Sequence, residues 1–336
     1  MLTASSNKTE ANWFWSELEA TWQITALGEL KLVVSIALQH EVETKTIQLS
    51  QTALIDKVML IYGQSDAKPA TSPMAHSTQL LWPDPNKQLD DVECECLTNI
   101  PYHSLVGSLM YIASGTRLDI AFAVSKLSHF LDCYCEAHWQ AAVQVVRYLK
   151  DTWMFSLRLS RTSSSLIGYC DSNYANDPGA EGHRSIAGYC FSLGNGMVSW
   201  SSKKQKTIAD STCTAEYMAV SEAGQELVWL HTLLRELNFE QSHATPLLCN
   251  NSTAMLLCGD QAFHNRVKHL DIKYHWIHEH VEKDEMVVGR IPTSGNVVDI
   301  LTKALPGPRF ITLQGCLGVI QWATDIRAEG ECKNPK

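Results

Sequence analysis

Residues 166–204, LIGYCDSNYANDPGAEGHRSIAGYCFSLGNGMVSWSSKK, decide the fold of this chain. Within them, LIGYCD, SIAGYCFSL and MVSWSS each have the pattern of a strand, and the turn at Gly194-Asn195-Gly196 joins the last two. Three consecutive strands with tight connections predict an antiparallel meander.

After this meander, the hydrophobic period changes from two to about 3.6 residues, which is typical of a helix. The predicted helix runs from Thr212 to Leu237, and Ser211 or Thr212 can cap its start. Its apolar face consists of Ala219, Ala223, Leu227, Leu230, Leu234 and Leu237.

Shorter elements are expected to complete this half of the chain. They are a strand at 247–250, a helix from Ser252, a helix at 271–281, a strand at 285–291 and a closing helix at 297–305. Three strands followed by alternating helices and strands predict an α/β fold, in which helices cover a mixed sheet.

Four polar residues stand where strands give way to helices. Asp171 closes the first strand, Glu216 lies early in the long helix, Asn250 closes the fourth strand, and Asp299 begins the final helix. Sites in α/β sheets gather at the carboxyl ends of strands, so we expect these residues to converge.

Acids gathered in this way repel one another unless cations neutralise them. Two Mg²⁺ ions about 3.5–4 Å apart can activate a water and stabilise the leaving oxygen of a phosphodiester. Taken singly, Asp171 is explained by a turn, and Glu216 and Asp299 by favourable charge at a helix N-terminus. Their joint placement favours a metal site.

The totals describe an ordinary globular chain of 336 residues, 45% hydrophobic and 19% charged, long enough for two units. It has no apolar run of about eighteen residues, and the start MLTASSNKTEANW lacks a secretory pattern. We therefore expect an intracellular protein, cytoplasmic or nuclear, with no membrane contact. The eleven cysteines are expected to be reduced thiols.

The net charge of −9 argues against a protein whose main work is to coat nucleic acid, because such proteins usually carry a basic excess. Any nucleic-acid contact must be local, and the compact basic run is Lys203, Lys204 and Lys206 in WSSKKQKT. A solvated hairpin edge explains that run equally well.

The first half of the chain carries little evident chemistry. Residues 68–101, rich in proline, serine and acids, are predicted to be a linker or surface loop. Two packing helices are expected next, at 119–131 and 138–149.

Many segments, in the right order, resemble the C-terminal part of the Pol polyprotein of copia-type LTR retrotransposons, from about Leu18 to Val319. They include LGELK, IQLSQ, KPATSPM, YHSLVGSLMYIASGTRLDIAFAVSKLSHF, EAHWQAAVQVVRYLKDT, TAEYMAVSEA, FHNRVKHLDIKYHWIHEHV, VVDILTKALPGPRF and residues 168–209. This resemblance implies the end of a reverse transcriptase followed by ribonuclease H, which degrades the RNA strand of RNA–DNA hybrids.

The resemblance also implies a fold and a set of boundaries. The fold is a ribonuclease H-like mixed five-stranded sheet flanked by helices, preceded by a small α+β thumb or connection remnant. The expected units are a reverse-transcriptase remnant at 1–67, the linker at 68–101, a helical connection region at 102–160, the ribonuclease H-like domain at 161–310 and a C-terminal tail at 311–336.

Carried over by position, Asp171, Glu216 and Asp299 match metal-binding acids for two Mg²⁺ or Mn²⁺ ions. The family's C-D-N-Q-S-A is Cys249-Asn250-Asn251-Ser252-Thr253-Ala254 here, so Asn250 replaces an acid. Asn250 stays a candidate metal ligand, because an asparagine can offer a neutral carbonyl oxygen to Mg²⁺, but it brings no negative charge, and its amide nitrogen is a donor. Losing a second-shell partner costs about 10–100-fold in affinity or activity, so we expect at least that loss here.

The polymerase is expected to be absent, because the adjacent pair Asp90-Asp91 lies in the polar stretch NKQLDDVEC. The expected partners are RNA–DNA hybrid or duplex nucleic acid and other Pol segments. Arg184 joins the three lysines as a candidate for binding nucleic acid. By analogy with related ribonucleases H, His269 is a candidate for assisting product release.

Two other interpretations stay open at this point. One is a catalytically dead module that keeps the fold and binds nucleic acid. The other is a non-functional remnant of a mobile element.

Overall fold

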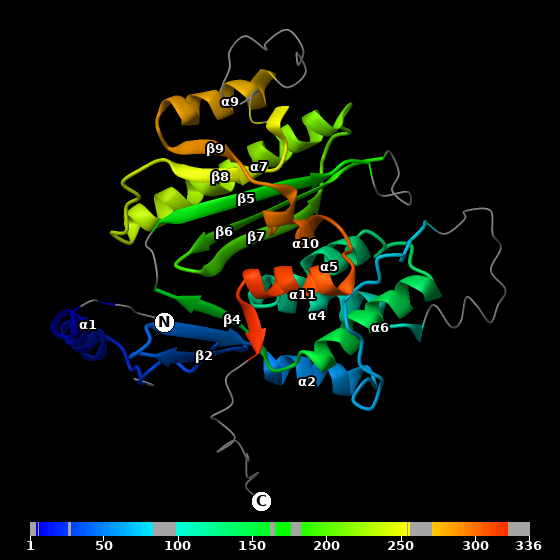
Figure 1. The fold of residues 1–336 in the computed structure, drawn as a ribbon. Helices are drawn as coiled ribbons and strands as arrows, with labels where there is room; N and C mark the ends of the chain where they lie inside the picture. The colour runs from blue at the N-terminus through cyan, green and yellow to red at the C-terminus, as the bar shows by residue number, and fades with distance from the viewer. Residues whose placement is uncertain are drawn as a thin grey trace, which may run out of the picture.

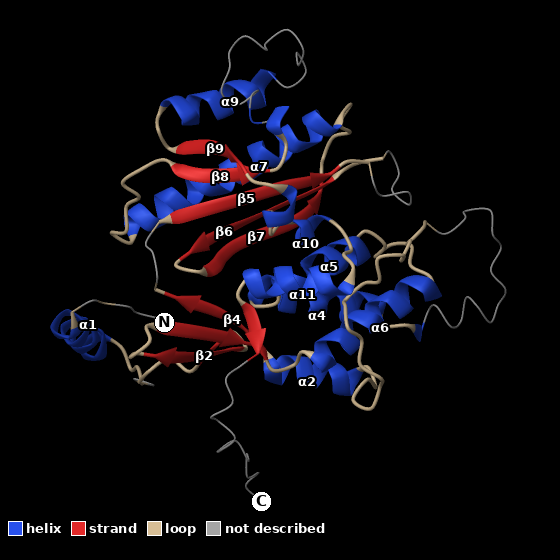
Figure 2. Cartoon of the chain, viewed as in Figure 1, coloured by secondary structure: helices blue, strands red, loops and turns tan. Residues whose placement is uncertain are grey.

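Two five-stranded sheets organise the molecule, and they lie one above the other in Figures 1 and 2. The structure is a computed structural model that describes residues 7–25, 28–82, 99–161, 165–175, 183–253 and 271–321, together with residues 5 and 255. Among the helices it describes, none is both long and apolar enough to cross a membrane.

The first sheet is antiparallel and joins strands from distant parts of the chain. Its order is β1-β2-β3-β4-β10, with β1 at Leu32–Val33, β2 at Ile36–Glu41, β3 at Thr46–Ser50, β4 at Phe155–Ser160 and β10 at Val319–Gln321. Leu157 pairs with Leu49 on one side and with Val319 on the other. The chain therefore returns to this sheet after it has completed the second one.

The helices beside the first sheet form a layer of their own (Figure 1). They are α2 (Thr52–Ile61), α4 (Tyr102–Gly115), η1 (Leu118–Ile120), α5 (Ala121–Ser128), α6 (Glu136–Asp151) and α11 (Gly307–Cys316), while α1 (Lys8–Thr21) buries no residue. The prediction of a helix at 138–149 is confirmed by α6. The helix predicted at 119–131 begins as the 3₁₀ turn η1 and ends earlier, at Ser128.

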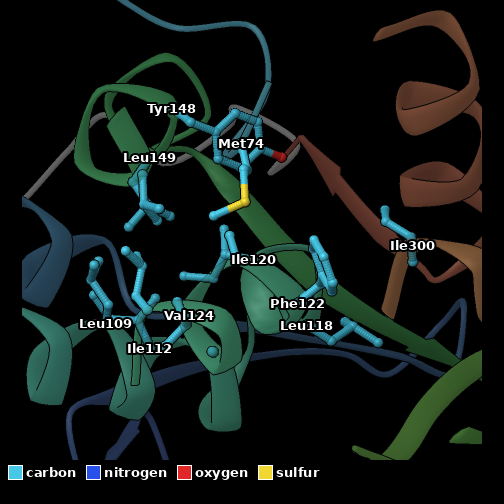
Figure 3. Close-up of a cluster of buried hydrophobic side chains, with 14 of the residues drawn as sticks. Met74, Leu109, Ile112, Leu118, Ile120, Phe122, Val124, Tyr148, Leu149 and Ile300 are labelled. Carbon is cyan, nitrogen blue, oxygen red and sulfur yellow. The ribbon is translucent and has the colours of Figure 1, made fainter. Parts of the chain in front are cut away.

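One hydrophobic core fills this layer, and Figure 3 shows part of it. Leu109 and Ile112 of α4, Val124 of α5 and Leu149 of α6 point into it. Met74, from the stretch predicted as linker or loop, is only 4% exposed and packs among them. That stretch thus adds apolar surface to the core.

The second sheet contains the predicted meander. Its order is β7-β6-β5-β8-β9, with β5 at Leu166–Asn173, β6 at Ile186–Leu193, β7 at Gly196–Lys204, β8 at Thr245–Cys249 and β9 at Met286–Arg290. The pairs β5–β6 and β6–β7 are antiparallel, whereas β5–β8 and β8–β9 are parallel. The predicted α/β fold with a mixed five-stranded sheet is confirmed.

Helices cover both faces of this sheet. On one face lie α7 (Thr212–Glu236) and α9 (Asp271–Glu282), whose apolar residues share a second core with Phe191 and Leu247. On the other face lies α10 (Asp299–Thr302), which follows η4 (Thr293–Gly295). The closing helix was predicted to be longer, but the chain turns to extended backbone at Lys303.

A glycine lets α10 approach the sheet closely. A Cβ atom added at Gly188 of β6 would lie 2.8 Å from Thr302 Cγ2 and 3.0 Å from Val298 Cγ1. Any larger residue would therefore push α10 away from the strand that neighbours β5.

Candidate active site

Three acids converge at one edge of the second sheet. Asp171 lies near the end of β5, Glu216 in the first turns of α7, and Asp299 at the start of α10. Their exposed fractions are 1%, 7% and 4%, so all three carboxyl groups are buried. Asn250 directly follows β8, the strand parallel to β5, and is half-buried.

Asp171 is surrounded by hydrogen-bond donors. Asn250 donates its side-chain amide Nδ2–H to Asp171 Oδ1 over 3.1 Å, and the Thr302 hydroxyl donates to Oδ2. Burial raises the pKa of Asp171, while Lys303 and these two hydrogen bonds oppose that rise. Asn250 thus presents a donor, and not an oxygen, toward the neighbouring acid.

Two cations approach Asp299. Lys303 Nζ lies 2.6 Å from Asp299 Oδ1 and 3.8 Å from Asp171 Oδ2, and Arg309 lies 3.6 Å from Asp299 Oδ2. Burial alone would lower the pKa of Lys303, but the two carboxylates raise it. Lys303 therefore remains charged between the two acids.

Glu216 is the least satisfied member of the group. Its carboxylate accepts a backbone hydrogen bond from Ser172, but the Oε2 atom has no hydrogen-bond partner within the described part of the chain. Burial, followed by the charge of Asp171, raises the pKa of Glu216 to about 8. A buried carboxyl group with an oxygen that accepts no hydrogen bond can bind a further ligand.

Asparagine side chains hold the end of β5 against α10. Asn296 donates to the backbone oxygen of Cys170 over 3.0 Å and accepts from the backbone N–H of Val298. Asn173 donates to the backbone oxygen of Thr302 over 3.2 Å. These bonds fix Asp299 beside Asp171, although the acids belong to segments far apart in sequence.

Sequence reasoning missed Thr302, Lys303 and Asn296. The spacing of Asp299 and Lys303, four residues apart, was a usable signal, because residues at this spacing share a helix face. The roles of Asn296 and Thr302 depend on contacts with β5, which no local pattern announces.

Comparison with known proteins places the chain in a family. The retrovirus-related Pol polyprotein from transposon TNT 1-94 of Nicotiana tabacum is 33% identical over 306 residues, which are 90% of this chain and 22% of that protein. The corresponding polyprotein from transposon RE2 of Arabidopsis thaliana is 36% identical over 276 residues, 82% of this chain and 18% of that one. The chain belongs to the copia-type retrotransposon Pol family. It spans about a fifth of the length of these two relatives.

Other similarities of this Pol chain are more local. The secreted RxLR effector protein 161 of Plasmopara viticola is 48% identical over 135 residues, 40% of this chain and 94% of that protein. Among solved structures, LC11 ribonuclease H1 in complex with an RNA/DNA hybrid matches at 19% identity and a TM-score of 0.30, covering 41% of this chain and 94% of that one. No protein-family model matches the chain.

The basic residues of this Pol chain lie at the same edge of the sheet as the acids. Lys203 and Lys204 end β7, Arg184 precedes β6, and Lys206 follows Gln205, whose backbone N–H bonds to Ser185. In the sheet register, Asp171 stands opposite Gly188, which stands opposite Ser202. The backbone of these four residues thus lies at the edge of the sheet where the carboxyl ends of β5 and β7 meet.

Two other predicted features cannot be placed. His269, the candidate for product release, lies outside the described residues. So do Asp90 and Asp91, the adjacent acids considered for a polymerase.

The donor chemistry of the Pol site fits a hard divalent cation. Three carboxyl groups form the oxygen set that Mg²⁺ and Mn²⁺ prefer, and within the described residues Glu216 Oε2 and the ion-paired Asp299 Oδ1 are buried without a hydrogen-bond partner. As arranged here, however, no group of three or more His, Cys, Asp and Glu side chains in the described ranges is poised to hold a metal ion. Lys303 and Arg309 supply positive charge to the acids instead.

Proposed function

We propose that this Pol chain is a ribonuclease H that hydrolyses the RNA strand of RNA–DNA hybrids, with an activity weakened at Asn250. The proposal assigns residues 161–310 to the ribonuclease H-like unit. Its main support is the convergence of Asp171, Glu216 and Asp299 at the carboxyl end of β5. Membership of the Pol family adds the substrate class.

The acids would hold the divalent ions. When bound, such ions activate a water and stabilise the leaving oxygen in phosphodiester hydrolysis. Asp171 and Asp299 would both coordinate the ions. Hydrogen bonds from Asn296, Asn173 and Thr302 hold the segments of these two acids side by side. Glu216 would contribute its Oε2 atom, which accepts no hydrogen bond from the described part of the chain.

The hybrid would cross the same edge of the sheet. Arg184, Lys203, Lys204 and Lys206 would bind backbone phosphates, which carry no sequence information but fix the register of a duplex. Because the chain as a whole is acidic, this local cluster would supply most of the salt-dependent affinity.

Asn250 is the reason to expect weak activity. It adds no negative charge to the site, and its Nδ2–H occupies an oxygen lone pair of Asp171. A cation would therefore find one anionic ligand fewer and one competing donor more.

The variant Asn250→Asp tests this function. We expect cleavage of an RNA–DNA hybrid in Mg²⁺ or Mn²⁺ to rise about 10–100-fold over the unmodified chain, because an anionic ligand is restored. The measurement is the rate of release of labelled RNA fragments, with the neighbouring Asn251→Asp as the matched control for an added carboxylate.

The double variant Asn250→Asp/Asp171→Asn should abolish the restored cleavage. Restored activity that survives loss of Asp171 would place the chemistry elsewhere. Robust cleavage by the unmodified chain would contradict the weakening by Asn250.

A second candidate function is a binding module without catalysis. The donation from Asn250 to Asp171 and the ammonium group between two acids favour it, since both satisfy carboxylates without a metal. Hybrid binding by the Asn250→Asp variant with no cleavage in either metal would support this alternative.

A further inference from the structure

The ammonium group of Lys303 lies beside the acidic cluster, which consists of Asp171, Glu216 and Asp299. Its Nζ atom makes a close ion pair with Asp299 Oδ1 at 2.6 Å and a longer one with Asp171 Oδ2 at 3.8 Å. It is also among the charges that act on Glu216. A single ammonium group thus serves all three acids.

The acids require such a charge. Three carboxyl groups that are more than nine-tenths buried lie together here, and burying a carboxylate is costly unless positive charge lies close by. Within the described residues, Arg309 is the other cation paired with these acids, at 3.6 Å from Asp299 alone. Lys303 therefore carries most of the neutralisation.

The side chain of Lys303 is also free to move away from the acids into solvent. Its backbone is extended, with φ −153° and ψ 155°, so it lies just past the end of α10. Its side chain is 32% exposed, against 6% for Asp299. Rotation of its four-carbon stem would carry the ammonium into solvent without moving α10.

We propose that Lys303 is a tethered counter-ion that neutralises the acidic cluster and that a divalent cation must displace. The inference rests on the proposed function in one respect, which is that the acids bind a divalent ion at all. Both cations need the facing oxygens of Asp171 and Asp299, and they repel each other at this range. The chain thereby keeps its site folded in the absence of metal, at the expense of metal affinity.

The test removes the charge and keeps the stem, with Lys303→Met. The matched control is Lys150→Met, because Lys150 is also partly buried but donates to the backbone oxygen of Ala67 over 2.8 Å, in the helical layer. Binding of Mn²⁺ is followed by the electron paramagnetic resonance signal of the free ion. The thermal midpoint in EDTA is measured on the same samples.

We expect Lys303→Met to bind Mn²⁺ roughly 10-fold more tightly than the unmodified chain, because the competing ammonium is gone. In EDTA we expect its thermal midpoint to fall further than that of Lys150→Met, because the acids lose their counter-ion. If Lys303→Met does not fold, Lys303→Gln, which keeps a donor for Asp299, gives the same comparison.

Unchanged or weaker Mn²⁺ binding by the Lys303 variants, while the unmodified chain binds the ion, would overturn displacement and leave the proposed function standing. A failure of the proposed function gives a different result. In that case neither the unmodified chain, nor Lys303→Met, nor Asn250→Asp would bind Mn²⁺, and the inference would fall with it.

Discussion

The molecule buries two clusters of charged residues, and they are built in opposite ways. In the helical layer, Arg117 and Asp119 form an ion pair at 2.8 Å with side chains that are 0% exposed. Arg117 also donates to Thr152, and Asp119 accepts hydrogen bonds from Tyr148 and Gln314. Every charge there has a partner from the protein itself.

In the acidic cluster of the second sheet, the described residues do not supply a complete set of partners for the buried carboxyl groups. Burial alone would raise the pKa of Asp119, but Arg117 and the hydrogen bonds lower it, whereas the pKa values of Asp171 and Glu216 are raised. The Oε2 atom of Glu216, which has no hydrogen-bond partner among the residues that the structure describes, adds to the contrast. A buried charge thus stabilises the fold when the protein supplies all of its partners, and points to a ligand when it does not.

The largest expected effect is on the ion pair of Arg117 and Asp119 in the helical layer. Asp119→Ala should lower the free energy of unfolding by about 3–5 kcal/mol, because it leaves the Arg117 charge buried without its partner. Urea denaturation measures the loss, and Asp151→Ala, an exposed acid at the end of α6, should change it by less than about 0.5 kcal/mol. A similar small change at Asp119 would contradict the assignment of a structural ion pair.

The next largest effect is on the acidic cluster, where a substitution should raise the free energy of unfolding and not lower it. Because the pKa of Glu216 rises from 4.5 to about 8 on folding, its stabilising contribution is fully present below the unfolded-state value and is lost as the pH rises through about 8. In EDTA, Glu216→Gln should therefore be more stable than the unmodified chain above this pH, by roughly 3–5 kcal/mol, and nearly equal to it at low pH.

Urea denaturation across the pH range checks this prediction. Glu236→Gln is the matched control, since Glu236 is an exposed acid in the last turn of the same helix, α7. Parallel stability curves for the two variants would show that Glu216 ionises freely in the folded protein.

The smallest expected effect changes the acidic cluster without changing its charge. Gly188→Ala should cost about 1–3 kcal/mol in urea denaturation, because the new methyl group meets Thr302 and Val298 and moves α10 from β5. Gly107→Ala is the control, since a Cβ there meets nothing within 4 Å and a helix gains from alanine. If both variants gained stability, the close approach of α10 would not matter to the site.

The elements with a strong local pattern could be predicted from sequence. The meander over 166–204 and the long helix α7 follow from hydrophobic period and turn residues, and the convergence of Asp171, Glu216 and Asp299 follows from the carboxyl-end rule. The closing helix was predicted too long, because the end of α10 depends on the backbone at Lys303, in a segment with a continuous helical pattern.

Other features depend on contacts that one segment alone does not encode. The pairing of Leu157 with Val319 joins strands with no sequence proximity, and the tail predicted at 311–336 gave no sign of β10. Likewise, the sequence shows that Asn250 is neutral. It does not show that the side-chain amide donates to Asp171, because that contact joins two neighbouring strands, β5 and β8.

The return of the chain to the first sheet has a consequence for synthesis. β4 and β10 are neighbours in that sheet, and the whole second sheet is inserted between them in the chain. On the ribosome, the second sheet can pair its strands before the first is closed, because β10 leaves the exit tunnel after β5 to β9. The first sheet, although its strands β1 to β4 precede the second sheet in the sequence, is thus completed after it, and until β10 pairs, β4 presents an open edge to any other strand nearby.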